Sequence, residues 1–561
     1  MCIYLSTYKF TSSFLTLRRI IEGLQSTGKV EEENVEIIKY IKKFKMVLYE
    51  NVNIDMDMML KDETGKEMLA LDVFSAAIRY LKTNLLDMCK RQHYLFNGDQ
   101  IRWILTVPAL WNDRAKLFMR QAANQAGISQ GQLEVALEPE AASLYCIEWM
   151  KRETSFDLEK GEKVLVLDAG AERYFCLTTI QALEYAWFLY VSSGGTVDIA
   201  IHQIKENGRI QELHRANGGD WGGTKVDQEF KQLLIDIVGN QVFEEFKLKY
   251  HNDYMDLFRD FEVAKRRDFS VAATGKVPIR LPGTVNELCK EINNKGINEI
   301  VSINNTFINH IELKRDKLLI DISIFKKLFE KTINEIKRHL QELYKKSDIK
   351  EIRTIFMVGG FSCCHLLYDC IQKEFPSVRV KVPMDPVLAV IKGSVIYGQR
   401  PEIFSSRISV YTYGIETTEP FDRKEHPANK KMSEAIDGKY HCDKIFCIHV
   451  KEGETVTLGS SVRKTYKTID PNQTGMDFKL YATKKKNPKF TDEPGCFYVG
   501  KLKVDLSRII PGKNKSREVE VELIYGGTEL EAVARDTKAG REFRGNFVLG
   551  SRTRKVSHKK E

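Results

Sequence analysis

The sequence has few cysteines and no repeated cysteine spacing. It contains 11 cysteines in 561 residues. Cys363 and Cys364 are adjacent and Cys442 lies five residues before Cys447, but neither pair is matched by a second pair at the spacing of a zinc site. This pattern excludes a disulfide-stapled scaffold and favours a reducing compartment. We therefore expect free thiols and a cytoplasmic protein.

The sequence also lacks a strong charge imbalance and a secretion signal. Its 86 basic and 77 acidic residues leave a formal net charge of +9, which is modest for this length. The first 19 residues have no basic leader ahead of an unbroken apolar stretch. The basic tail, residues 551–561, is expected to be solvated rather than bound to nucleic acid. We expect a monomer with no nucleic-acid partner.

What the chain does contain is enough apolar residues, 43%, for more than one core. Residues 103–108 form a buried-strand pattern, followed by Asn112 as a possible helix cap and by apolar residues at helical spacing until Gly127. Residues 164–168 and 355–358 are two more apolar runs that lead directly into glycines. This alternation predicts α/β architecture.

The pattern changes after about residue 399. Residues 501–506 and 517–525 alternate strictly, and the second run is followed by a glycine pair and a further alternating run, which predicts a hairpin. We therefore divide the chain into an α/β domain over residues 1–400, a β-rich domain over residues 401–550 and the tail.

Two glycine pairs have the form of a phosphate cradle, in which glycine leaves backbone N–H groups uncovered. Gly194 and Gly195 precede Thr196 and an alternating strand, and Gly359 and Gly360 follow an apolar strand. Either pair alone is typical of an ordinary turn. Their combination on one chain favours an anion site.

Two further patterns are ambiguous by themselves. Gly222 and Gly223 precede an amphipathic helical pattern over residues 226–237, which fits either a phosphate-binding helix start or an ordinary cap. Glu262, Lys265 and Arg266 share one helical face, which fits either a ligand site or a salt-bridged surface.

Four motifs together carry a resemblance to a known family. Residues 106–111 (TVPALW), 137–143 (LEPEAAS), 194–198 (GGTVD) and 357–362 (MVGGFS) resemble, in order and spacing, motifs of the seventy-kilodalton heat-shock ATPases, and most of all the divergent 12A/12B group. The resemblance spans residues 42–550. It implies an actin-like, ribonuclease-H-like two-lobed ATPase domain followed by a β-rich domain that binds peptides or partner proteins. It also implies ATP or ADP with Mg²⁺ as cofactors.

The resemblance assigns roles to particular residues. Glu138 would help to organise magnesium and the attacking water, while Asp168 and Asp198 would hold Mg²⁺ through water. Thr196, with these three, forms the expected catalytic set. The expected nucleotide contacts are Gly170, Gly194, Gly195, Thr196, Gly222, Gly223, Glu262, Lys265, Arg266, Gly359, Gly360, Phe361 and Ser362.

The sequence departs from the family pattern in two places. The second phosphate loop begins at Asp168 and resumes at Gly194, and removing residues 171–193 would restore an unbroken motif, so we interpret this aromatic-rich segment as an inserted exon or retained intron. A membrane span over residues 174–191 is the weaker alternative, because the stretch is short and contains Glu184. The family's first phosphate loop is missing before residue 101, and residues 23–30 have P-loop spacing but end in Val30 rather than Ser or Thr.

These departures keep three functions open. The first is a chaperone-type ATPase that couples nucleotide state to the binding of client or partner proteins. The second is an interaction scaffold with a degenerate nucleotide site, and the third is a small-molecule kinase of the same superfold. Because loss of a single phosphate-stabilising element commonly costs about a hundredfold in rate, we expect hydrolysis to be weak or absent.

Overall fold

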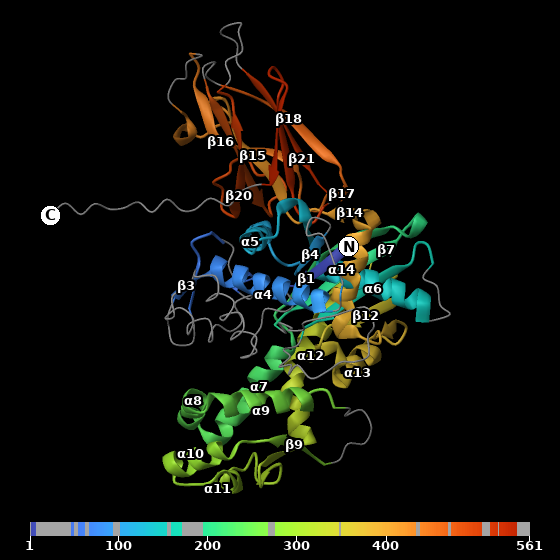
Figure 1. Cartoon of the computed structure of the whole chain (residues 1–561), viewed down its shortest axis with the longest axis vertical. Coiled ribbons are helices and arrows are strands. Elements are labelled where there is room, and N and C mark those ends of the chain that lie inside the picture. Colours follow the sequence, from blue (N-terminus) through green and yellow to red (C-terminus); the bar gives the residue numbers. More distant parts are fainter. Residues whose placement is uncertain are drawn as a thin grey trace, which may run out of the picture.

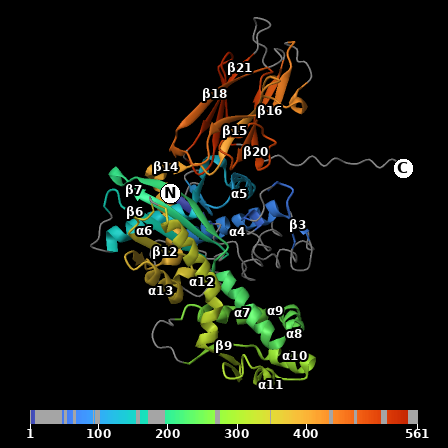
Figure 2. The same ribbon diagram turned by 180° about the vertical axis from the view of Figure 1, so that it is seen from behind.

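The computed structural model describes residues 2–6, 47–49, 54–61, 67–91, 93, 101–153, 159–170, 195–267, 275–346, 349–432, 438–468, 473–507, 517–525 and 527–546. These residues form three tiers along the long axis of the molecule: a β-rich tier at one end, a central α/β tier and a mostly helical tier at the other end (Figure 1). Helices α7 (Gly223–Val238) and α12 (Ile322–Tyr344) run from the central tier into the helical one, as the view from behind shows (Figure 2).

The first sheet of the central tier has three parallel strands, in the order β1 (Cys2–Ser6), β4 (Arg102–Val107) and β5 (Leu133–Leu137). Helices α4 (Ala70–Arg91) and α5 (Asp113–Gln125) pack against it, and a short hairpin, β2 (Met59–Lys61) and β3 (Glu67–Leu69), precedes α4. The Asn112 side chain caps α5 by accepting the Ala115 N–H at 2.9 Å. Gly127, with a φ of 82°, follows the helix end. The strand and helix expected between residues 103 and 127 are confirmed.

The second sheet has seven strands and is mixed. Its order is β13 (Arg379–Lys381), β12 (Thr354–Val358), β6 (Lys163–Ala169), β7 (Val197–Ile204), β8 (Ile210–Gly219), β14 (Phe404–Ile408) and β17 (Thr455–Thr457). Strands β13, β12 and β6 are parallel to one another, whereas β7 is antiparallel to β6. The last two strands of this sheet come from residues beyond 401. The domain boundary expected there stays a prediction.

Two helices lie between the two sheets of the central tier. Helices α6 (Glu138–Glu153) and α14 (Ala389–Gln399) share one apolar cluster with residues of both sheets, among them Ile104 of β4 and Val166 of β6. Their axes approach closely at Gly393, where a Cβ would lie 1.6 Å from the backbone oxygen of Ala141. The absence of a side chain at Gly393 therefore sets the spacing between α14 and the start of α6.

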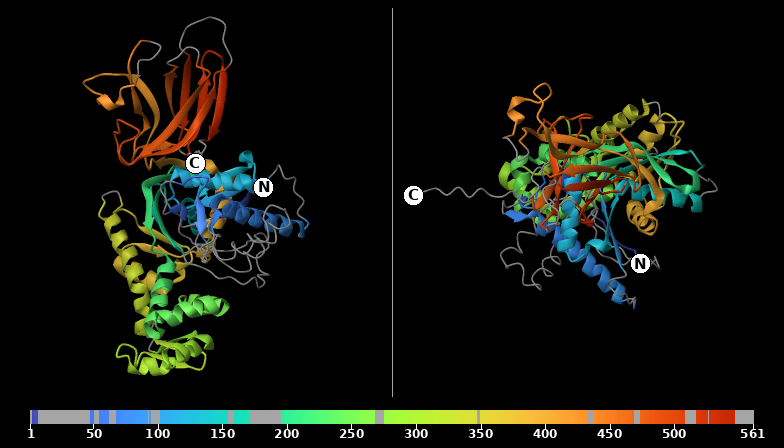
Figure 3. Two further views of the ribbon diagram at one scale, coloured as in Figure 1. Left: turned by 90° about the vertical axis from the view of Figure 1, so that its left-hand side faces the viewer. Right: turned by 90° about the horizontal axis from the view of Figure 1, so that it is seen from above.

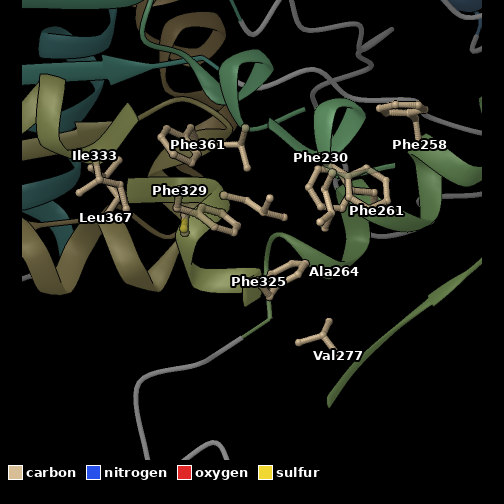
Figure 4. Packing of buried hydrophobic residues seen from close by; sticks show 14 of the residues in the cluster. Phe230, Phe258, Phe261, Ala264, Val277, Phe325, Phe329, Ile333, Phe361 and Leu367 are labelled. Carbon is tan, nitrogen blue, oxygen red and sulfur yellow. The ribbon is translucent and has the colours of Figure 1, made fainter. Parts of the chain in front are cut away.

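The other face of the seven-stranded sheet packs on the helices that lead into the third tier. Leu165 and Met357 belong to this second cluster, in which the rings of Phe230 and Phe261 stack with centroids 3.9 Å apart (Figure 4). The remaining elements of this region are α8 (Asn240–Lys249), α9 (His251–Ala264), β9 (Lys276–Arg280), α10 (Gly283–Asn293), α11 (Ile297–Ile303), β10 (Ile311–Lys314), β11 (Lys317–Asp321) and α13 (His365–Glu374).

The β-rich tier consists of two antiparallel four-stranded sheets. One has the order β16 (His441–Val450), β15 (Thr412–Pro420), β19 (Gly475–Thr483) and β20 (Cys496–Asp505). The other has the order β18 (Ser461–Lys467), β21 (Glu518–Ile524), β22 (Glu531–Asp536) and β23 (Arg541–Asn546). Val519, Val521 and Leu523 are buried on one face, as the alternation predicts, and the β21–β22 pairing confirms the expected hairpin. The left-hand view of Figure 3 shows this tier at one end of the molecule.

The β-rich tier and the first sheet share a continuous apolar core, which includes Phe118 of α5 and Leu480 of β19. Polar contacts reinforce it: Arg120 of α5 donates from Nε to Glu529 Oε1 at 2.7 Å, and Arg114 donates from Nη1 to the Tyr498 oxygen at 2.8 Å. The β-rich tier is therefore docked on α5 rather than connected only by the chain.

Candidate functional site

The strand ends of β6 and β12 meet at a glycine. Gly359 follows β12 with a φ of 87°, and a Cβ on it would lie 2.3 Å from the Ala169 oxygen and 2.5 Å from Asp168 Oδ1. Its N–H donates to the Pro386 oxygen at 2.8 Å. Only glycine fits this backbone conformation and this spacing. The predicted adenosine loop is thus in contact with the aspartate of the predicted phosphate loop.

Two acidic side chains lie side by side at this point. Asp168 of β6 and Asp198 of β7 are directly opposite each other in the antiparallel ladder, and both are 2% exposed. Residues that face each other across such a ladder point to the same side of the sheet. The Thr196 hydroxyl donates to Asp198 Oδ2 at 3.3 Å. The structure therefore brings three of the four predicted catalytic residues together.

Backbone hydrogen bonds tie the glycine segments to one another. The Gly170 N–H donates to the Thr196 oxygen at 3.1 Å, and the Gly223 N–H donates to the Gly170 oxygen at 2.8 Å. The Gly222 N–H donates to the Gly195 oxygen at 3.2 Å. Three glycine-bearing segments that are separate in the sequence thus meet at the ends of β6 and β7. Gly194 lies outside the described residues, as does the insert interpreted between residues 171 and 193.

Helix α7 begins where these segments meet. Gly222 is its N-cap and provides no side-chain cap, so the helix presents its positive end beside Gly170 and Gly195. Such a helix start is a favourable place for an anion. The amphipathic helix expected at residues 226–237 is confirmed as part of α7.

Three charged residues at and just after the end of α9 form an ionic cluster, in which Glu262 and Lys265 are buried. Lys265, only 3% exposed, contacts Glu262 Oε2 at 2.5 Å and Asp227 Oδ1 of α7 at 2.6 Å, while Arg266 contacts Glu262 Oε1 at 2.7 Å. Burial alone would lower the pKa of Lys265, but the carboxylates of Asp227 and Glu262 hold that pKa above its ordinary value. Lys265 Nζ also lies 3.4 Å from the Gly223 oxygen, which connects the cluster to the glycine segments.

The Phe361 and Ser362 side chains are buried and have partners within the fold. Phe361 is 3% exposed and packs in the apolar cluster near Phe329 and Leu367 (Figure 4). The Ser362 hydroxyl donates to the Val358 oxygen at 2.5 Å. Both belong to the short 3₁₀ turn Phe361–Cys363, for which Gly360 is the N-cap. Their backbone, rather than their side chains, is what they can offer to a ligand.

Glu138 is the first residue of α6 and is 1% exposed. Helix α6 also packs against β6, and burial together with the nearby Asp168 carboxylate raises the pKa of the Cys146 thiol on α6. Within its first turn, α6 is fixed by Glu140, which accepts from Arg407 Nε at 2.6 Å and from Nη2 at 2.8 Å. The helix that carries Glu138 is thereby bonded to β14.

The chain is similar in sequence to known proteins over most of its length. No family model matches it. It is 30% identical over 536 residues to heat shock 70 kDa protein 12A of Mus musculus and to that of Homo sapiens, which covers 89% of this chain and 78% of each relative. It is 28% identical over 551 residues to human heat shock 70 kDa protein 12B, which covers 91% of this chain and 79% of the relative.

The chain belongs to the heat shock 70 kDa protein 12 group. Its membership confirms the resemblance carried by the four motifs, and the fold is accordingly the actin-like α/β domain followed by a β-rich part. Among the described residues, no helix is long and apolar enough to cross a lipid bilayer. The span weighed over residues 174–191 lies outside the described residues, and so do the P-loop-like residues 23–30. The cysteines whose side chains are described are free thiols, as expected.

Some residues of the site were not predicted from the sequence of this member of the heat shock 70 kDa protein 12 group. Asp227, which pairs with Lys265, lies four residues after Gly223 on α7. Its only sequence signal is that it is an acidic residue one turn after a glycine-rich helix start. Gly218 has a φ of 151°, and a Cβ there would lie 1.8 Å from the Val197 oxygen, directly beside Asp198. The arginine that holds α6, Arg407, has no local signal at all.

Proposed function

We propose that this protein binds ATP or ADP where the glycine segments converge, and that the bound nucleotide alters how its β-rich part holds client or partner proteins. The observation that carries the proposal is the contact of Gly359 with Asp168 and Ala169. It joins the two motifs that the family uses for adenosine and phosphate, although about 190 residues separate them. Family membership supports the same conclusion.

The donor set fits a magnesium ion. Asp168 and Asp198 are two buried carboxylates on one side of a sheet, and like charges so placed are stabilised by a cation between them. Mg²⁺ prefers oxygen ligands, keeps several waters, and is commonly held by one or two carboxylates together with substrate phosphates. Asp168 and Asp198 would hold it through water, as the family pattern implies. When bound, Mg²⁺·ATP would supply the phosphoryl group that a water molecule attacks.

The chain's own residues would then act by positioning. The positive end of the α7 dipole would lie near the phosphates, and the cluster of Glu262, Lys265 and Arg266 would face the adenosine. Glu138, at the start of α6, would orient a water molecule. Positioning and charge stabilisation are the main contributions that proteins make to phosphoryl transfer.

Hydrolysis is proposed to be slow in this chain. Gly170 and Thr196, which flank the interrupted loop in the sequence, are hydrogen-bonded neighbours. A chain lacking residues 171–193 would join the same two strands by the short glycine turn of the family motif. The insert interrupts the predicted phosphate loop in the sequence, and this favours the degenerate scaffold as the second candidate function.

A linkage experiment separates the two candidates. ATP affinity is measured on the whole chain with and without a saturating unfolded polypeptide, such as reduced carboxymethylated lactalbumin, and phosphate release is followed in the same samples. A chaperone-type protein changes its ATP affinity by several-fold when the polypeptide is added, and the polypeptide affinity changes by the same factor when ATP is added. Unchanged affinities in both directions would leave only the scaffold. The variant lacking residues 171–193 is expected to release phosphate faster than the whole chain.

A further inference from the structure

A lysine at the junction between the central and β-rich tiers has unusual neighbours. Residues 409–411 connect β14 of the seven-stranded sheet to β15 of the β-rich tier. Lys484, directly after β19, donates from Nζ to the Val410 oxygen at 3.2 Å. Arg215 of β8 donates from Nη1 to the same oxygen at 3.5 Å. Two cationic groups from different tiers therefore converge on one carbonyl.

The remaining groups around Lys484 do little to hold its proton. Its Nζ lies 4.2 Å from the centroid of the Tyr411 ring. Within the described part of the chain, no carboxylate oxygen comes within 4.0 Å of this nitrogen. The nearby acid Glu452 is engaged by Arg215, with Nη1 and Oε1 3.4 Å apart, and Asp113 accepts the Tyr413 hydroxyl.

These neighbours change the chemistry of the amine. Burial of part of the side chain, together with the charge of Arg215, lowers the pKa of Lys484 to about 8, while Glu452 and Asp113 oppose that shift. An amine next to another cation carries more of its nucleophilic, unprotonated form at neutral pH than an ordinary lysine does. Lys484 also remains exposed to solvent, so a reagent can reach it.

We propose that Lys484 is an acyl-acceptor site, modified on Nζ by acyl thioesters at the junction of the two tiers. The Nζ lone pair forms a bond to the thioester carbonyl carbon, the carbon–sulfur bond breaks, and the sulfur leaves as a thiolate that takes up the proton lost by the nitrogen. The product is an amide and a free thiol, and no oxidant or reductant is needed. Acylation leaves Arg215 as the single positive charge at the Val410 oxygen.

Lys485 provides a matched control one residue away. Its Nζ contacts Glu493 Oε2 at 2.9 Å, and its side chain is 47% exposed. It therefore differs from Lys484 mainly in having an anionic partner in place of a neighbouring cation. The Lys485 ammonium is thus engaged by a carboxylate, whereas Lys484 has the Arg215 guanidinium beside it.

The test treats the whole chain with limiting acetyl-coenzyme A over a series of pH values and measures acetylation of Lys484 and Lys485 by peptide mass spectrometry. Lys484 is expected to react about tenfold faster than Lys485 at neutral pH, and its rate should level off above about pH 8. In Arg215→Gln, the plateau in the Lys484 rate should move to higher pH, while the acetylation rate of Lys485 stays the same at each pH. Two results in the unsubstituted chain would each overturn the proposal. One is equal acetylation rates at the two lysines, and the other is a Lys484 rate that shows no plateau as the pH increases.

Discussion

Gly359 packs directly against Asp168: a Cβ at position 359 would lie 2.5 Å from Asp168 Oδ1. This contact connects the strand ends of β12 and β6 at the centre of the candidate site. Because Gly359 has a φ of 87° as well, a side chain there would meet both backbone strain and a steric clash.

Gly359→Ala is therefore expected to abolish stabilisation of the protein by Mg²⁺·ATP. Gly161→Ala is the matched control, since Gly161 has a φ of 88° but nothing within 4 Å of its would-be Cβ. The control should lose about 1–2 kcal/mol from backbone strain and keep the nucleotide response. The measurement is the thermal unfolding temperature with and without Mg²⁺·ATP. If Gly359→Ala responds to nucleotide as strongly as Gly161→Ala does, the glycines at β6 and β12 are not part of the site.

The local elements of this site follow from the sequence. The apolar strand at 355–358 and the glycines after it could be predicted because their signal lies within a few residues. The helix after Gly222 could be predicted for the same reason. The roles of the site residues stay predictions, since Gly194 lies outside the described residues and no ligand contact tests the others.

Long-range partners could not be predicted in this way. Glu140 and Arg407 are 267 residues apart, and nothing near either residue marks the other. The pairing of β14 with β8 is likewise invisible to a local pattern, because a strand keeps the same alternation whichever sheet it joins. Side-chain pairs of this kind depend on tertiary structure rather than on spacing.

The closest helix contact gives a stability prediction. Gly393→Ala would place a Cβ 1.6 Å from the Ala141 oxygen and force α14 away from α6, so we expect it to lower the free energy of unfolding by about 2–3 kcal/mol. Gly283→Ala, at the first residue of α10 with nothing within 4 Å of its Cβ, should be neutral or slightly stabilising. Urea unfolding compares the two. Equal stabilities would mean that α14 and α6 are not closely packed.

A buried glutamate gives a pH prediction. Burial raises the pKa of Glu212 to about 7 from an ordinary value of 4.5, although its carboxylate accepts the Ile408 N–H at 2.8 Å. The folded chain binds this proton more tightly than the unfolded chain does. The contribution of Glu212 to stability is therefore complete below about pH 4.5 and is lost as the pH rises through 7.

Glu212→Gln removes this dependence. The free energy of unfolding of Glu212→Gln is subtracted from that of the unsubstituted chain. This difference should fall by about 3 kcal/mol between these two pH values. Taking the difference removes the opposite effect of His202, whose pKa burial lowers to about 4 and whose contribution is lost as the pH falls from 6.5. Urea unfolding across the range provides the measurement. A difference that does not vary with pH would show that Glu212 has the same pKa in the folded and the unfolded chain.

The docking of the β-rich tier can be measured through one ion pair. Arg120 and Glu529 each have side chains only 10% exposed, and they join α5 to the turn before β22. A double-mutant cycle with Arg120→Met and Glu529→Gln is expected to give a coupling energy of about 1–3 kcal/mol. The exposed pair Lys467 and Glu518, 65% and 41% exposed, should give less than about 0.5 kcal/mol in the same assay. Similar values for the two pairs would contradict close docking of α5 on the β-rich tier.

Isothermal titration calorimetry of the whole chain with ATP and Mg²⁺, repeated on the variant lacking residues 171–193, tests the central claim most directly. We predict saturable binding at one site, tighter in the shortened variant, since Gly170 and Thr196 would then be joined by the complete glycine turn. Absence of binding by both proteins, each shown to be folded, would contradict the assignment of the glycine segments as a nucleotide site.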